Sequence, residues 1–158
     1  MTDSTPTNIT VSPIKIAFLS HADYQSWLRL WQSYLTFYET SLPLITIEAT
    51  WRNLLDSNVP IYGFGAWLDD TLVGFTHVVL HPNTWNNTEC CYLEDLYVSE
   101  AVRGYGVGRA LIEHVYEFAR QQNCNRVYWT TQEDNTTARH LYDTLAIKTD
   151  MIQYRKDL

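Results

Sequence analysis

Basic residues are scarce in this sequence, and their scarcity bears on its partners. The 158 residues include 11 Lys and Arg against 18 Asp and Glu, which gives a net charge of −7 and a pI near 5.1. Domains that bind nucleic acid usually present a basic face, so this composition argues against nucleic acid as a partner. An acidic chain is compatible with a cationic substrate.

Cysteines and long apolar runs are also scarce. The three cysteines, Cys90, Cys91 and Cys124, are odd in number and two are adjacent, which fits neither a disulfide scaffold nor a C-x-x-C zinc site. We therefore expect a reducing, cytoplasmic setting. A membrane-spanning helix needs about 20 apolar residues, and no apolar run in this sequence is that long. We therefore expect no membrane partner.

The first dozen residues lack the basic start and the apolar stretch of a signal peptide. We expect residues 1–12 to form a flexible N-terminal tail. The remaining length and the 46% apolar content suit one domain over residues 13–158.

Glycine is rare too, yet three of the six glycines lie in VRGYGVGRA, residues 102–110. Glycine allows a positive φ or a close approach to a ligand, and a helix start after such a loop favours an anion, most often phosphate. The alternative is a turn that only reverses the chain. A Walker loop would need Lys and then Ser or Thr after Gly108, and a dinucleotide fingerprint would need glycine at Arg109, so both fail.

Hydrophobic periodicity predicts strands and helices on both sides of this loop. This order fits an α/β sandwich: a mostly antiparallel sheet turns parallel around the helix after the glycine loop, and helices flank both faces. Thr46 is the expected cap of the second helix, and Asp134 or Asn135 that of the last. Strands are predicted at residues 14–19, 61–68, 71–80, 91–98 and 126–131 and in MIQYR, and helices at residues 23–40, 47–55, from the glycine loop to about 122, and 134–145.

Two blocks of the sequence resemble the GNAT superfamily of acetyl-CoA-dependent N-acetyltransferases. The first, CYLEDLYVSEAVRGYGVGRALIEHVYEFA, contains the R-x-x-G-x-G of a coenzyme loop, and its YLED is similar to spermidine/spermine and thialysine acetyltransferases. The second, DNTTARHLYDTLA, resembles the family's N-x-x-A-x-x-L-Y element. The resemblance implies a GNAT-type fold and direct acetyl transfer, in a ternary complex, to a primary amine of a small molecule such as a polyamine or amino acid.

The resemblance implies acetyl-CoA as cosubstrate and no metal. In such enzymes the strand before the loop splays from its neighbour and holds the pantetheine arm, while the loop N–H groups and nearby arginines bind the pyrophosphate. Asn135 has a second interpretation as a helix cap. The positions so implicated are Leu96, Tyr97, Val98, Arg103, Gly104, Tyr105, Gly106, Val107, Gly108, Arg109 and Asn135.

The resemblance also assigns chemistry to Glu94 and Tyr142. An alkylamine with a pKa of about 10 must lose a proton before it attacks. Glu94 matches the position of the base that removes this proton in the family, directly or through water. Tyr142 matches the acid that protonates the departing thiolate. The alternatives are a solvated carboxylate at a sheet edge for Glu94 and an ordinary core tyrosine for Tyr142.

Aromatic residues recur at helical spacing in the first predicted helix, at Trp27, Trp31, Tyr34 and Tyr38. They are candidates to wall an amine site by cation–π contact, although the same spacing describes a helix core. Tyr34 and Tyr38 are the candidate substrate-binding residues of this stripe.

Two further candidates for substrate binding are His77 and Asp95. Asp95 is expected on the strand face opposite Glu94. His77 shares a strand face with His81, and Trp85 follows closely, so this group is a candidate for the acceptor pocket. A zinc site lacks further ligands, and polar histidines at a strand end are the ordinary alternative.

Rival functions stay open at this point: a protein or histone lysine acetyltransferase, and a non-catalytic acetyl-CoA sensor. The resemblance also allows a homodimer. After Tyr142 many relatives continue to a Gly-Phe pair, whereas this chain has Asp150-Met151, so the arrangement of the C-terminal strands is open.

Overall fold

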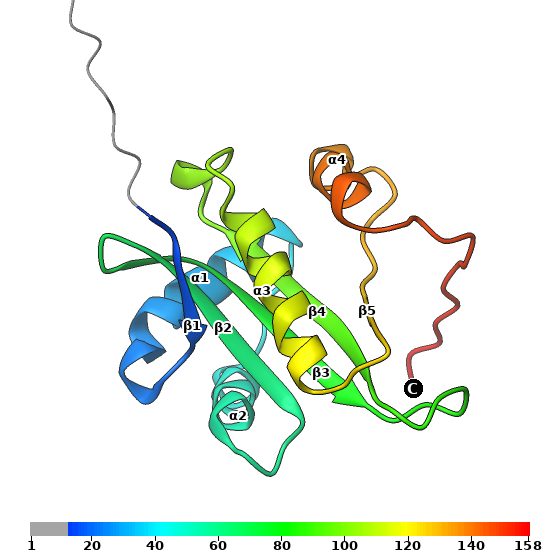
Figure 1. Ribbon diagram of the computed structural model, residues 1–158. Helices are drawn as coiled ribbons and strands as arrows, with labels where there is room; N and C mark the ends of the chain where they lie inside the picture. Colours follow the sequence, from blue (N-terminus) through cyan, green and yellow to red (C-terminus); the bar gives the residue numbers. More distant parts are fainter. Residues whose placement is uncertain (1–12) are drawn as a thin grey trace, which may run out of the picture.

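A computed structural model describes residues 13–158, and the tail expected at residues 1–12 lies outside them. The described chain has one sheet in the strand order β1-β2-β3-β4-β5 (Figure 1). Neighbouring strands are antiparallel from β1 to β4 and parallel between β4 and β5, which confirms the predicted mixed sheet. The strands are β1 (Lys15–Phe18), β2 (Ile61–Leu68), β3 (Thr71–His81), β4 (Cys90–Val98) and β5 (Arg126–Tyr128).

Helices cover both faces of this sheet, as predicted. In Figure 1, α1 and α2 lie behind the strands and α3 lies in front of them. One core cluster joins Trp27, Trp31 and Trp51 to Phe75 of β3, and another joins Phe64 of β2 to α3. The helices are α1 (Tyr24–Phe37), α2 (Leu44–Leu55), α3 (Val107–Gln121) and α4 (Thr136–Leu145), and short 3₁₀ turns lie at η1 (His21–Asp23) and η2 (Glu100–Val102).

Helix α3 is held on the sheet by one continuous apolar stripe. Val107, Leu111, Val115 and Phe118 recur at intervals of three and four and are buried. Burial of each large apolar side chain contributes about 1.5–3 kcal/mol. This packing fixes the start of α3, and with it the glycine loop, at the end of β4.

Two helix ends differ from the prediction. Helix α2 begins at Leu44 rather than residue 47, and Pro43 rather than Thr46 is its N-cap residue. The Pro43 carbonyl accepts hydrogen bonds from the N–H groups of Thr46 and Ile47 at 2.9 and 3.2 Å, and proline suits a helix start because no intrahelical N–H is needed there. Helix α1 ends at Phe37, because the chain turns at Glu39 with φ 53°.

Strand β5 is shorter than predicted. It ends at Tyr128 rather than residue 131, because β4 pairs with it only over Cys90–Tyr92. Beyond that point β4 continues along β3 to Val98, while the chain after β5 leaves the sheet. The two parallel strands therefore diverge directly after their shared segment.

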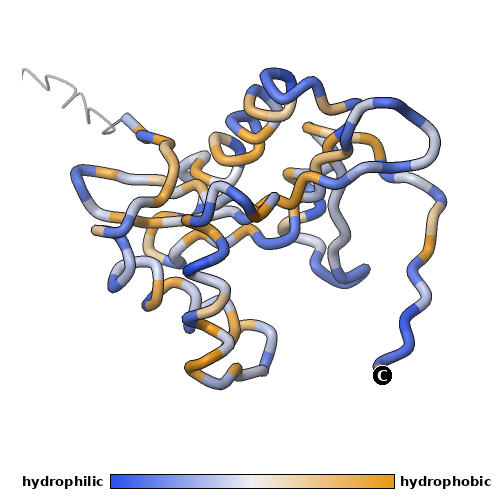
Figure 2. The backbone as a smooth tube through the Cα atoms, turned by 90° about the horizontal axis from the view of Figure 1, so that it is seen from below, coloured by the Kyte–Doolittle hydropathy of each residue, from blue (hydrophilic) through white to orange (hydrophobic). Residues whose placement is uncertain are grey.

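The predicted strand in MIQYR is wrong. The structure shows no helix or strand at residues 146–158, and Figure 2 shows this segment extending from the body of the molecule to the C-terminus. A strand needs a partner for its backbone, and this segment pairs with no strand of the described sheet. The apolar side chains of Ile147, Met151 and Ile152 are exposed as a result.

None of the helices within residues 13–158 is both long and apolar enough to cross a bilayer.

Candidate active site

The glycine loop has the backbone geometry that its sequence predicts. Gly104 and Gly106 have φ values of 87° and 83°, which side-chain-bearing residues rarely adopt. The space that a Cβ would enter is open at both positions, with no atom within 4 Å. Gly106 is the N-cap residue of α3, whose first-turn N–H groups have no intrahelical partner. The loop therefore fits an anionic group such as pyrophosphate.

Gly108 and Arg109 connect the start of α3 to α4. A Cβ on Gly108 would lie 3.4 Å from Leu141, so the absence of a side chain permits close packing. The Arg109 guanidinium donates to the Thr144 hydroxyl at 2.8 Å. These contacts hold α4 beside the glycine loop.

Arg103 lies between the loop and the end of α1. Its Nε donates to the Val98 carbonyl at 3.1 Å, and its guanidinium lies 5.7 Å from the centre of the Tyr97 ring and 6.0 Å from that of Phe37. Tyr105 is exposed at the tip of the loop. The arginine is thus fixed at the end of β4, where a cation can face an anionic ligand.

The divergence of β4 from β5 frees one edge of β4. Residues 93–98, except Glu94, pair with β3, but within the described chain they have no partner strand on the β5 side. Leu96, Tyr97 and Val98 lie in this segment and lead to the glycine loop. Their position suits backbone hydrogen bonds to an extended ligand.

Glu94 occupies a bulge in β4. The register passes from Leu93 opposite Val78 to Asp95 opposite His77, so Glu94 has no partner on β3. A bulge interrupts the alternation of side chains that predicts opposite faces for Glu94 and Asp95. Glu94 reaches solvent, yet shielding of its carboxylate by the protein, and then the charge of Asp95, raise its pKa.

Asp95 ends a chain of hydrogen bonds that runs through the core. The Tyr34 hydroxyl donates to Oδ1 at 2.7 Å, and His77 Nδ1 lies 2.9 Å from Oδ2. Behind the histidine, Trp27 Nε1 donates to His77 Nε2 at 3.0 Å. Burial, and then the Asp95 charge, raise the pKa of Tyr34.

Of these residues, His77 is 2% exposed and Trp27 is fully buried. The structure therefore places His77 behind Asp95 instead of on the surface of the site. Trp27 has a polar partner that the aromatic stripe alone did not reveal, because its partner is 50 positions away in sequence.

Tyr142 lies on α4, on the other side of the freed edge of β4. Its ring packs edge-on against Trp129, with the centres 5.4 Å apart. Burial, and then Tyr38, raise the pKa of Tyr142, while burial, and then Asp95, raise that of Tyr38. Tyr38 contacts Tyr34 with ring centres 5.0 Å apart, on the acidic side of the site.

Asn135 acts as a helix cap. Its Oδ1 accepts the Ala138 N–H at 3.4 Å, and its Nδ2 donates to the Thr131 hydroxyl at 3.4 Å. The cap interpretation is thus observed, and a bond to pantetheine stays a prediction.

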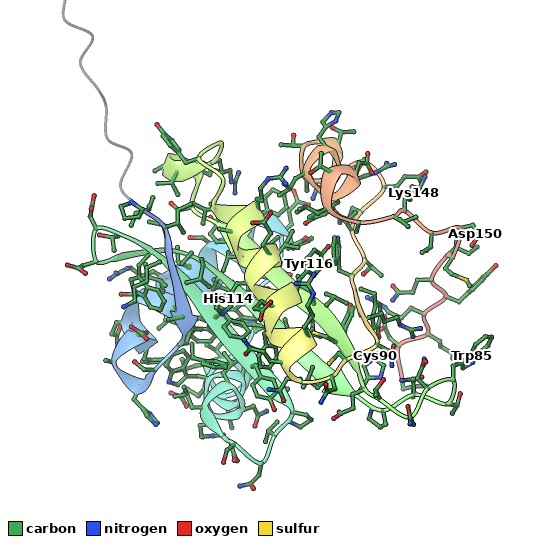
Figure 3. The ribbon with its side chains drawn as sticks, viewed as in Figure 1. Trp85, Cys90, His114, Tyr116, Lys148 and Asp150 are labelled. Carbon is green, nitrogen blue, oxygen red and sulfur yellow. The ribbon has the colours of Figure 1, made fainter. Side chains whose placement is uncertain are left out.

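His81 and Trp85 do not join the other candidates. His81 bonds the Tyr128 hydroxyl at 2.7 Å and pairs in register with Cys90, at the end of β3 away from Asp95. Trp85 is 91% exposed in the loop between β3 and β4, at the opposite end of the sheet from the glycine loop (Figure 3). The sequence distance from His77 is short, but the extended strand separates them.

The cysteines are free thiols outside this cluster. Cys90 and Cys91 are buried, and burial raises the pKa of the Cys91 thiol to about 12. Burial also raises the pKa of Cys124. A thiol with a raised pKa is a poor nucleophile at neutral pH.

The sheet, the glycine loop before α3 and the splayed strand β4 match the arrangement that the resemblance to acetyltransferases predicts. The chain belongs to the Acetyltransferase (GNAT) family, which it matches over residues 24–146, and it is an N-acetyltransferase. The predicted family, fold and enzyme class are confirmed.

The chain is similar to several N-acetyltransferases of known sequence or structure. A D-amino-acid N-acetyltransferase of Saccharomyces cerevisiae is 33% identical over 159 residues and covers 99% of both chains. A thialysine N-epsilon-acetyltransferase of Caenorhabditis elegans is 30% identical over 88 residues, which are 56% of this chain and 54% of that protein. The structure of an aminoglycoside N-acetyltransferase in complex with CoA superposes with a TM-score of 0.78 at 20% identity and covers 93% and 97% of the two chains.

Proposed function

We propose that this enzyme transfers acetyl from acetyl-CoA to a primary amine of a small, cationic molecule of the amino-acid or diamine class. The observation that carries the proposal is the pair Glu94 and Asp95. Within residues 13–158, neither carboxylate forms an ion pair with a lysine or arginine. A substrate ammonium would supply the missing cation, because uncompensated acidic groups in a partly buried site favour a positive ligand.

Acetyl-CoA supplies the thioester whose carbonyl the amine attacks. The first-turn N–H groups of α3 and the open backbone at Gly104 and Gly106 would hold its pyrophosphate. The Arg103 guanidinium, held at the end of β4, would face the same charge, and the free edge at Leu96–Val98 would hold the pantetheine arm and orient the thioester carbonyl.

The amine would enter as an ammonium ion and bind Asp95. Both oxygens of this carboxylate accept hydrogen bonds, from Tyr34 and from His77, which fix its plane. Glu94, whose pKa is raised, then takes the proton directly or through water. A base with a pKa nearer neutrality is better matched to proton transfer at physiological pH.

Tyr142 would protonate the departing thiolate. Burial raises the pKa of its phenol, so the hydroxyl keeps its proton at neutral pH and can donate it. The reaction then needs no covalent acetyl-enzyme, and the raised pKa values of Cys91 and Cys124 support direct transfer.

Two wider assignments accompany this proposal. The three free cysteines support a reducing, cytoplasmic compartment. The exposed apolar side chains of Ile147, Met151 and Ile152 support a homodimer in which a second copy covers the C-terminal segment. Light scattering of the full chain, with and without residues 146–158, tests the dimer.

The substrate assignment is tested by free-thiol release from acetyl-CoA with a panel of acceptors. The panel contains D- and L-amino acids, linear diamines, lysine and thialysine, an aminoglycoside and a basic peptide, with the E94Q and Y142F variants as controls. Turnover of cationic small amines in preference to D-glutamate is expected. Turnover of the peptide alone, or equal turnover of D-glutamate and D-lysine, would contradict the proposal.

A further inference from the structure

We propose that His77 is a positioning residue: a neutral imidazole, fixed in one tautomer by Trp27, that orients the Asp95 carboxylate without neutralising it. The inference rests on the proposed role of Asp95 as ammonium ligand. It adds a buried pair, Trp27 and His77, to the residues that set amine affinity.

The tautomer follows from the partners of the ring. An indole N–H is a donor only, and Trp27 Nε1 lies 3.0 Å from His77 Nε2. Nε2 must therefore accept, and the single proton of the ring lies on Nδ1. Nδ1 then donates to Asp95 Oδ2, 2.9 Å away. A protonated ring would set two N–H donors against each other at Nε2, so the geometry selects the neutral form.

In the described part of the chain, no positively charged side chain near His77 neutralises the Asp95 carboxylate. The ring is stacked on Phe75 with centres 4.7 Å apart and lies 5.2 Å from Trp31. The titratable groups that face it are Asp95 and Glu94 on β4 and, beyond Asp95, the phenols of Tyr34 and Tyr38 on α1. All of these groups are acidic, and the structure shows no lysine or arginine paired with them in the described part of the chain.

The hydrogen bonds orient the Asp95 carboxylate but do not neutralise its charge. Tyr34 and His77 each occupy one oxygen of Asp95, and both donors are uncharged. Each carboxylate oxygen accepts more than one hydrogen bond, so lone pairs remain for a ligand. A lysine or arginine at the position of His77 would orient Asp95 equally well but would cancel the charge that attracts the amine.

The sharpest test is Trp27→Phe, because it removes the donor to Nε2 and keeps an aromatic ring at the position. In this variant the ring can take a second proton as the pH falls, and an imidazolium beside Asp95 would cancel its charge. We expect the KM for the amine to rise about tenfold more between pH 8 and pH 6 in W27F than in the wild type, with the KM for acetyl-CoA unchanged.

Trp31→Phe is the matched control. Trp31 is the neighbouring tryptophan of α1, is 6% exposed and stacks on Trp27, but its Nε1 has no hydrogen-bond partner in the described structure. W31F should therefore keep the pH dependence of the wild type. If W27F and W31F show the same pH dependence, the proposal is overturned.

Two substitutions at His77 test the same point without a cavity at Trp27. An amide can accept from Trp27 and donate to Asp95 while it stays neutral, so H77Q should retain amine affinity within about threefold, whereas H77L should lose tenfold or more. Equal amine KM values for H77Q and H77L would overturn the proposal, even if W27F fails to fold. Nitrogen NMR of labelled histidine gives a direct readout: the wild type should show a protonated Nδ1 and a bare Nε2 at pH 7.

Asp95→Asn separates this inference from the function on which it rests. If D95N leaves the amine KM unchanged, Asp95 is not the ammonium ligand and the proposed substrate site fails. If D95N raises that KM while W27F and H77L do not, the site stands and the positioning role of His77 is refuted.

Discussion

The Tyr34 hydroxyl donates to Asp95 Oδ1 at 2.7 Å and thereby joins α1 to β4 across 61 positions of the sequence. Helix α1 thus does more than cover the sheet, because it supplies one of the two donors that hold the candidate ammonium ligand. Removal of either donor leaves a partly buried carboxylate with an unmet hydrogen bond.

Tyr34→Phe should weaken amine binding and stability together. A hydrogen bond to a charged group is worth about 1.5–3 kcal/mol, so we expect the amine KM to rise about tenfold and the free energy of unfolding to fall by a similar energy. Denaturant titration and steady-state kinetics measure the two effects. A variant with unchanged amine KM would show that Asp95 does not depend on Tyr34.

The same variant should change the response to alkaline pH. Burial and Asp95 raise the pKa of Tyr34 in the folded state, so its contribution is fully present below the unfolded value of about 10 and is lost as the pH rises toward the folded value. The stability difference between wild type and Y34F should therefore shrink above about pH 10. A constant difference from pH 8 to pH 11 would contradict this expectation.

Tyr142→Phe should reduce kcat and spare the binding of coenzyme. Loss of a positioned acid typically lowers the rate about 10²- to 10⁴-fold. Calorimetric titration with CoA should give the wild-type affinity, because the ring and its packing on Trp129 are retained. Tyr154→Phe changes an exposed tyrosine of the C-terminal segment in the same way and should keep the wild-type kcat. Wild-type turnover in Y142F would exclude the phenol as the acid.

Glu94→Gln should remove the acidic limb of the pH profile. The general base works only when ionised, so kcat/KM of the wild type should fall as the pH drops through the raised pKa of Glu94. This fall should begin above the ordinary glutamate value of about 4.3. E94Q should be slow at every pH without that limb, and Glu117→Gln on the surface of α3 should match the wild type. An unchanged acidic limb in E94Q would assign it to another group.

Gly106→Ala should raise the KM for acetyl-CoA through backbone strain alone. The φ of 83° costs an alanine about 1–2 kcal/mol, whereas no atom near the new Cβ would clash. That cost corresponds to about a tenfold loss of affinity if the loop relaxes away from its binding conformation. Gly106→Asn is the matched variant, because asparagine tolerates positive φ better and should recover part of the loss. Equal KM values for all three proteins would show that the loop conformation does not limit binding.

Local sequence patterns were sufficient for much of the fold. The hairpin between β2 and β3 turns at Asp69 and Asp70, as predicted, with φ values of 46° and 62°. The glycine loop and Asn135 likewise have the backbone roles expected of them. In each case the signal lies within a few residues, where turn and capping chemistry act.

The remaining features depend on contacts between distant segments. The bulge at Glu94 is a property of the pairing between β3 and β4, and the residues of YLED do not predict it. The bond between Trp27 and His77 spans 50 positions, and the helical spacing of the aromatic stripe gave no sign of its polar partner. The missing strand in MIQYR shows the converse case, since a β-like pattern forms no strand without a neighbour to pair with.

The brief pairing of β4 with β5 has a mechanical consequence. Only three register pairs tie β5 to the sheet, and α4 is attached mainly through side chains such as Arg109 and through the Tyr116 hydroxyl, which donates to the Leu145 carbonyl. A ligand bound along the freed edge of β4 would connect this strand to β5 and α4, which the sheet itself holds only weakly. Among the strands and helices of the sheet domain, β5 and α4 should then show the fastest amide exchange in the free enzyme and gain the most protection when coenzyme binds.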